Sequence, residues 1–254
     1  MKIKRIFNWQ VFLCILLIAL SALVYFIHYL VFRDLHHILI YLIGDIAFVF
    51  IEVMLVTLVL HQLLHYREKR VLLNKLNMVI GTFFTEVGTE LLRICSAFDQ
   101  NTANVTQYLV VNNDWSDKEF ARVKKHIEKH EAQIDSKKNG LGEMKKYLVA
   151  KRQFLLNLLE NPNLLEHESF TDLLWAVFHL TDELAYRIDF SRLPETDYQH
   201  LSGDIKRAYY QLTVQWLAYM KHLKQSYPYL FSLAMRTNPF DPNAKVEVGK
   251  IDEK

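Results

Sequence analysis

The chain has 254 residues, and 51% of them are hydrophobic. Its 30 Lys and Arg residues nearly balance 28 Asp and Glu residues, which argues against a nucleic-acid surface built on net positive charge. Two cysteines allow neither a disulfide framework nor a paired-cysteine metal motif, so we expect a reducing compartment for the soluble part.

The first apolar segment predicts a transmembrane helix. Residues 9–32 carry no formal charge and exceed the ~20 apolar residues that cross a bilayer. A cleaved signal peptide is the competing interpretation, because Ala19-Leu20-Ser21 resembles a cleavage site. The apolar run continues for eleven residues beyond Ser21, more than a signal peptide requires, so we expect the span to be retained.

A second span is predicted over residues 38–60 and completes a hairpin within residues 1–65. Basic residues concentrate before the first span and after the second, so the positive-inside rule places both termini in the cytoplasm. We therefore expect a protein of the bacterial inner membrane, with the lipid bilayer as a partner.

Two carboxylates interrupt the second span. Asp45 and Glu52 are seven residues apart and therefore project from one helix face. A carboxylate at the centre of a membrane helix costs roughly 2.5–3.5 kcal/mol, so both should face protein or water. One hypothesis is a path for protons or cations, and the alternative is a polar clamp that joins helices or subunits. The path would be lined by Asp45, Glu52 and Tyr41 of the second span and by Ser21, Tyr25 and His28 of the first.

Residues 66–99 are predicted to form a helical stalk, because apolar residues recur there at spacings of three or four. Gly81, Thr85 and Gly88 form a separate stripe of small residues, which permits the close approach of another helix. Packing between the subunits of a homo-oligomer and packing within one chain explain this stripe about equally well.

A helical domain is predicted over residues 100–243, followed by a disordered tail over residues 244–254. Ser116 and Glu119 have the spacing of a capping box, and prolines mark further helix boundaries. The sequence contains no alternating strand pattern and no Gly-rich phosphate loop. The predicted fold class is all-α: a two-helix transmembrane hairpin that continues through a long helical stalk into a cytoplasmic helical bundle.

Three residue pairs with i,i+4 spacing are weak candidates for metal ligands, because this spacing places both side chains on one helix face. The set superficially resembles the HxxxE and HxxxH elements of hemerythrin-like di-iron bundles. Only His130 lies on the apolar stripe of its helix, whereas a buried metal needs ligands that point inward. We therefore expect solvated helix faces, with no metal, cofactor or catalytic residue. The pairs are His126 and His130, His179 and Glu183, and His200 and Asp204.

Two stretches, LLHYREKRVLLNKLNMVIGTFFTEVG and YPYLFSLAMRTNPF, resemble segments of an uncharacterised group of bacterial two-span membrane proteins. The resemblance implies an inner-membrane setting and carries no activity with it.

The leading hypothesis is a homo-oligomeric membrane protein whose hairpins form a small proton- or cation-permeable path. The alternative is a membrane-anchored interaction or assembly protein whose cytoplasmic domain docks a protein partner. Neither hypothesis makes the protein an enzyme, and a metal-dependent enzyme would rest on the histidine pairs alone.

Overall fold

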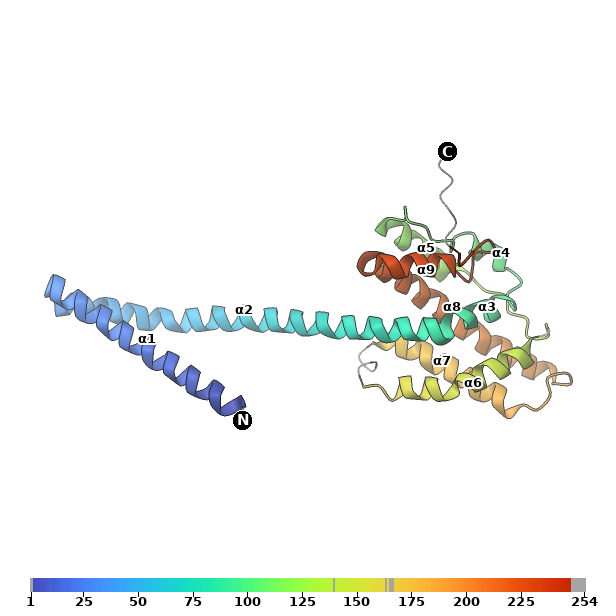
Figure 1. The fold of residues 1–254 in the computed structure, drawn as a ribbon, viewed down its shortest axis with the longest axis horizontal. Helices are drawn as coiled ribbons and strands as arrows, with labels where there is room; N and C mark the ends of the chain where they lie inside the picture. The colour runs from blue at the N-terminus through green and yellow to red at the C-terminus, as the bar shows by residue number, and fades with distance from the viewer. Residues whose placement is uncertain (1, 139, 163, 165–166, 248–254) are drawn as a thin grey trace. The chain divides into compact units, whose positions relative to one another are not determined.

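A computed structural model describes residues 2–138, 140–162, 164 and 167–247, except for the side chains of 2–8, 10, 70–72 and 74 (Figure 1). Within these residues the fold is helical throughout, with a single isolated bridge between Asp99 and Ile134 in place of any strand. The predicted all-α class is therefore confirmed. The chain divides into two compact units, Met1–Lys69 and Arg70–Lys254. Most of the predicted disordered tail lies outside the described residues.

The first unit is a helical hairpin. Helix α1 spans Lys2–Phe32, and helix α2 begins after a tight turn and spans Leu35–Phe83. Arg33 adopts a left-handed conformation with φ 50° in this turn, and the Asp34 carboxylate accepts a hydrogen bond from the backbone N–H of His37 (3.1 Å). Two segments, Val11–Phe32 and Leu35–Lys69, are long and apolar enough to cross a membrane. The two predicted spans are thus helical, and their apolar side chains are almost all exposed.

Helix α2 continues without a break into a π-helical turn, η1 (Phe84–Gly88), and then into α3 (Thr89–Ser96). The Thr89 hydroxyl donates to the carbonyl of Phe84 (2.8 Å), which helps to satisfy the backbone where the π turn disrupts the regular pattern. From Leu76 onward, the segment predicted as a stalk contributes side chains to the core of the second unit. It is therefore part of a folded domain.

The remaining helices follow the predicted starts closely. The Ser116–Glu119 capping box is formed, and it begins α5. A short helix, α4, precedes α5. Helix α5 ends at Lys129, and Ile134 beyond it forms the bridge to Asp99. The bounds are α4 Thr102–Thr106, α5 Asp117–Lys129, α6 Leu141–Leu159, α7 Glu168–Tyr186, α8 Glu195–Ser226 and α9 Pro228–Arg236.

Helix α8 is the central element of the second unit, and it contacts α3, η1, α5, α7 and α9. Tyr209 and Trp216 of α8 are buried as expected for core aromatics, whereas Tyr210 is 39% exposed. Helix α7 packs between α6 and α8, and it is joined to α8 by the connection Arg187–Pro194. This arrangement brings the C-terminal half of α7 against the N-terminal half of α8.

The predicted small-residue stripe packs within the chain. A Cβ atom on Gly81 would lie 3.5 Å from the ring of Tyr219 of α8, and Gly88 is enclosed by the rings of Phe83 and Phe84. Thr85 is exposed and donates its hydroxyl hydrogen to the carbonyl of Gly81 (2.9 Å). Intrachain packing thus accounts for both glycines, and a role of this stripe in an oligomer stays a prediction.

Candidate metal centre

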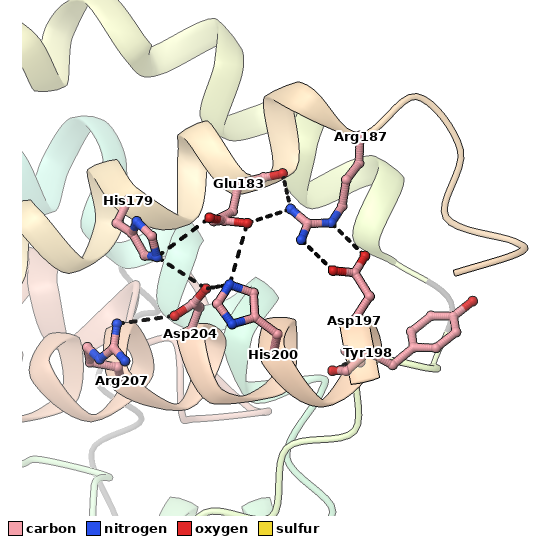
Figure 2. Close-up of polar contacts among 9 residues, drawn as sticks. His179, Glu183, Arg187, Asp197, Tyr198, His200, Asp204 and Arg207 are labelled. Atoms are coloured by element: carbon pink, nitrogen blue, oxygen red, sulfur yellow. Dashed lines mark hydrogen bonds and ion pairs between the residues drawn. The ribbon is translucent and has the colours of Figure 1, made fainter. Parts of the chain in front are cut away.

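Four polar side chains converge where α7 and α8 face each other (Figure 2). His179 and Glu183 project from α7, and His200 and Asp204 project from α8. Each pair has i,i+4 spacing, so both members of a pair extend from one helix face toward the other helix. We call these four residues the His-carboxylate cluster.

The distances within the cluster are those of a compact ligand set. Nε2 of His179 and Nε2 of His200 lie 3.4 and 3.3 Å from Oδ2 of Asp204. The Glu183 carboxylate lies 3.9 Å from His179 and 3.5 Å from His200. Tetrahedral bonds of about 2.0–2.1 Å would put neighbouring ligand atoms roughly 3.3–3.4 Å apart. The two distances to Asp204 are therefore close to what a tetrahedral ion requires. The two distances to Glu183 involve different oxygens, Oε1 toward His179 and Oε2 toward His200, so Glu183 would have to turn one oxygen toward the ion.

Asp204 is the most deeply placed member of the cluster. Its side chain is 3% exposed, and its Oδ2 atom is buried without a hydrogen bond from any described residue. A buried carboxylate oxygen that accepts no hydrogen bond is unfavourable unless a positive charge lies beside it, and here that charge can come from a protonated His179 or His200 or from a bound cation. Oδ2 is also the atom that both imidazoles approach. The arrangement thus provides a negative centre at which a cation would be stabilised.

Two arginines donate hydrogen bonds to the two carboxylates of the cluster, Glu183 and Asp204. Arg187 donates to Oε2 of Glu183 (2.6 Å) and forms a two-pronged pair with Asp197, at 2.8 and 2.6 Å. Arg207 donates from Nη1 to Oδ1 of Asp204 (3.1 Å). Metal-binding carboxylates are commonly oriented by such outer hydrogen bonds. Both carboxylates therefore keep a fixed position and leave one oxygen available to a metal.

The same contacts determine the protonation of the carboxylates. The hydrogen bond from Arg187 holds the pKa of Glu183 below its ordinary value, and the same donor lowers the pKa of Asp197. The hydrogen bond to Asp197 in turn raises the pKa of the Arg187 guanidinium. Glu183 is consequently ionised at neutral pH, as a metal ligand must be.

The structure brings together two of the three predicted pairs and corrects their expected environment. We expected His179, Glu183, His200 and Asp204 on solvated faces. The two histidines are exposed as expected, but Asp204 is buried and Glu183 is partly covered. The covered face of α7 is wider than its large apolar residues indicate, since Ala176, seven residues before Glu183, is also buried. The sequence did show two i,i+4 pairs on consecutive helices. They were discounted because their side chains do not point into the core, but a site at the edge between two helices does not require such ligands.

The third predicted pair lies elsewhere. His126 is exposed on α5, and its ring is 4.1 Å from the ring of Tyr108. His130 follows α5 and lies 3.4 Å from the buried carboxylate of Asp99, which also accepts backbone hydrogen bonds from two other residues. These contacts explain His130 as a structural residue, and the di-iron arrangement suggested by three pairs does not form.

Only some of the predicted residues of the hairpin contact one another. The Tyr25 hydroxyl donates to Oδ2 of Asp45 (3.4 Å), which joins the two helices. His28 lies beside His37, with 6.2 Å between ring centroids, and His37 contacts the ring of Tyr41 (4.7 Å). His37 thus lies between His28 and Tyr41, while Asp45 contacts Tyr25.

The other hairpin residues are more open. Ser21, Tyr25 and His28 line one shallow groove on α1. Asp45 and Glu52 are exposed, and Glu52 makes no hydrogen bond or ion pair within the described residues. The hairpin by itself therefore leaves both acids exposed.

Comparison with known proteins gives the same division of the chain. A family model described as "MJ1433, N-terminal helical domain" matches residues 2–64, and one described as "Uncharacterized protein MJ1433, C-terminal helical domain" matches residues 72–236. The chain is 49% identical over 234 residues to "Uncharacterized protein MJ1433" from Methanocaldococcus jannaschii, an alignment that covers 92% of this chain and 94% of the relative. No solved structure matches the chain. The cluster lies within the C-terminal helical domain.

Proposed function

We propose that this chain, which belongs to the MJ1433 family with its helical N- and C-terminal domains, is a metal-binding protein. Its ligand set is the His-carboxylate cluster, His179, Glu183, His200 and Asp204. The observation that carries this proposal is the buried Oδ2 atom of Asp204, which accepts no hydrogen bond from the described residues and lies 3.3–3.4 Å from two imidazole nitrogens.

The chemistry of the donors indicates the kind of ion. Two imidazole nitrogens with two carboxylate oxygens suit a divalent transition metal such as Zn²⁺, Fe²⁺ or Mn²⁺, whereas Ca²⁺ and Mg²⁺ favour oxygen ligands alone. A bound ion would join α7 to α8 and would supply a Lewis-acidic centre at the edge of the domain.

Metal analysis of the full-length chain in detergent tests this proposal. After dialysis against Zn²⁺ and then against metal-free buffer, we expect one equivalent of zinc per chain. His200→Ala should weaken binding about 100-fold, because a ligand is lost at a site whose outer partners alone account for 10- to 100-fold effects. Asp204→Asn removes the central charge and should have at least as large an effect.

A matched control is available in the same domain. His126→Ala removes another exposed histidine with i,i+4 spacing, and it should leave zinc binding unchanged. Because Asp204→Asn changes a buried residue, helicity is measured by circular dichroism in every variant. Absence of bound zinc, cobalt, iron and manganese from the folded wild-type chain would reject the proposal.

The exposed apolar surface of the hairpin supports a membrane-anchored protein. No side chain of Val11–Phe32 is buried, only Tyr25 and His28 are partly covered, and the side chains of Leu35–Lys69 are nearly all exposed, although both segments are strongly apolar. Exposed apolar surface of this extent is favourable against lipid and unfavourable against water. We propose that the hairpin spans a prokaryotic plasma membrane, with both termini in the cytoplasm. A cytoplasmic partner that docks on the helical domain is compatible with this arrangement.

A second candidate function rests on the contact between Tyr25 and Asp45. It supports the hypothesis that intramembrane polar groups of a homo-oligomer either form a proton or cation path or clamp the helices together. Exposed Glu52 would then be covered by another subunit. The metal-binding and membrane proposals are independent, because they concern different units of the chain.

A further inference from the structure

The cluster is open on its solvent side. The side chains of His179 and His200 are 46% and 50% exposed, while Asp204 behind them is 3% exposed. An ion held by these residues would therefore have protein ligands on one side and solvent on the other. Because the four cluster residues would already fill a tetrahedral shell, an additional ligand would raise the ion to five-coordination, which zinc sites also reach.

The charges around the cluster favour an anion as this ligand. Glu183 and Asp204 contribute two negative charges, which a divalent ion would balance. Arg187 is already balanced by Asp197, at 2.6 Å between Nη2 and Oδ1. Arg207 then remains as a positive charge in excess, so the occupied site would carry a net charge of about +1.

Arg207 also has free hydrogen-bond donors. Its side chain is 61% exposed, and only Nη1 makes a hydrogen bond within the described residues. A guanidinium carries five N–H donors in one plane, which match the oxygens of phosphate or carboxylate. Asp204 places these donors close to the ion, because Oδ1 accepts from Arg207 and Oδ2 is the oxygen that faces the two histidines.

From this arrangement, and resting on the metal-binding function proposed above, we propose that the occupied site binds a phosphate group. One phosphate oxygen would coordinate the ion, and another would accept hydrogen bonds from Arg207. Phosphate is favoured over carboxylate because its charge approaches −2 at neutral pH and its oxygens point toward two separate cations. The phosphate group belongs either to inorganic phosphate or to a phosphomonoester.

Cobalt substitution separates this inference from the metal-binding proposal. The full-length chain is loaded with saturating Co²⁺ in phosphate-free buffer, and the visible absorption of the bound ion is recorded. Inorganic phosphate and glycerol phosphate are then titrated in separate experiments. We expect a saturable change in the absorption band with at least one of them, and the probe that binds more tightly identifies the source of the phosphate group.

Variants at two arginines test the role of Arg207. In Arg207→Gln, phosphate affinity should fall about 10- to 100-fold, because hydrogen bonds to a charged group are lost. The matched control is Arg152→Gln, which removes another exposed arginine paired with an aspartate of α7, Asp182 (3.1 Å). Arg152→Gln should keep the phosphate affinity of the wild-type chain. Co²⁺ is kept saturating in every variant, so only phosphate affinity is compared.

The other outcomes of these titrations distinguish failure of the metal-binding function from failure of the phosphate inference. If no Co²⁺ band forms, both the metal-binding function and this inference are rejected. If the band forms but neither phosphate probe alters it, only this inference is rejected. Acetate binding as tightly as phosphate would reject the phosphate class, and an unchanged phosphate affinity in Arg207→Gln would reject the assigned geometry.

Discussion

At the scale of single residues, Gly88 is a position where a methyl group has no space. A Cβ atom there would lie 2.5 Å from Cδ1 of Phe84 and 2.8 Å from Cε1 of Phe83, and both rings are buried in the core. Gly88→Ala should therefore lower the free energy of unfolding by about 1–3 kcal/mol, the usual cost of overpacking. Chemical denaturation of the full-length chain, followed by tryptophan fluorescence, measures this change.

Gly203 provides the opposite case for the same substitution. It lies within α8, and nothing occupies the space within 4 Å of its Cβ position. Gly203→Ala should stabilise the helix by about 0.5–1 kcal/mol, because alanine loses less backbone entropy on folding. Equal effects of the two substitutions would show that packing around Gly88 is looser than described.

At the scale of elements, Tyr147 joins α6 to the π-helical turn. Its hydroxyl donates to the carbonyls of Val87 (3.1 Å) and Glu86 (3.3 Å), and burial raises its pKa to about 12. An unfolded tyrosine ionises near pH 10, so the unfolded state loses its proton first as the pH rises. The stability from Tyr147 is thus fully present below about pH 10 and is lost progressively toward pH 12.

The raised pKa of Tyr147 predicts how Tyr147→Phe changes the stability of the chain at alkaline pH. The substitution should lower the free energy of unfolding by about 1 kcal/mol at pH 7, and it should flatten the fall in stability above pH 10. Some slope will remain, because burial also raises the pKa of Cys95 to about 12. Denaturation midpoints between pH 7 and 12 test this, with the highly exposed Tyr186→Phe as control. A slope as steep in Tyr147→Phe as in the wild-type chain would contradict the assignment.

Sequence patterns predicted the starts of helices better than they predicted the contacts between helices. Ser116 with Glu119 located the start of α5, and Pro194 and Pro228 located the starts of α8 and α9, because caps and prolines act through local backbone chemistry. The side of a helix that meets another helix is not a local property. For that reason the four members of the His-carboxylate cluster were recognised as two i,i+4 pairs, but their convergence was not.

At the scale of the whole molecule, Asp45 and Glu52 of the apolar hairpin distinguish the path hypothesis from the clamp hypothesis. In proteoliposomes, a homo-oligomeric path predicts that Asp45→Asn combined with Glu52→Gln reduces proton or cation flux to the level of protein-free vesicles. The reason is that the ionisable groups along the path are lost while the apolar surface remains. Oligomer size in nanodiscs, measured alongside the flux, should stay unchanged.

The clamp predicts a different result for the same double variant. Oligomer size or hairpin stability would change, and the wild-type chain would show no flux above background. Asp34→Asn is the control for loss of an acid in the turn between the helices, outside the predicted spans. A flux that the double variant leaves intact would reject the path hypothesis.

The sequence by itself determined the helical class, most helix starts and the two apolar segments, because capping, proline chemistry and hydrophobic periodicity depend on neighbouring residues. It also contained the pairs His179 with Glu183 and His200 with Asp204. Only the tertiary structure decided that these pairs face each other, that Asp204 is buried, and that Gly81 packs against the ring of Tyr219. These features depend on the register in which α7 packs on α8 and α2 approaches α8, and register is set by contacts between residues that are distant along the chain.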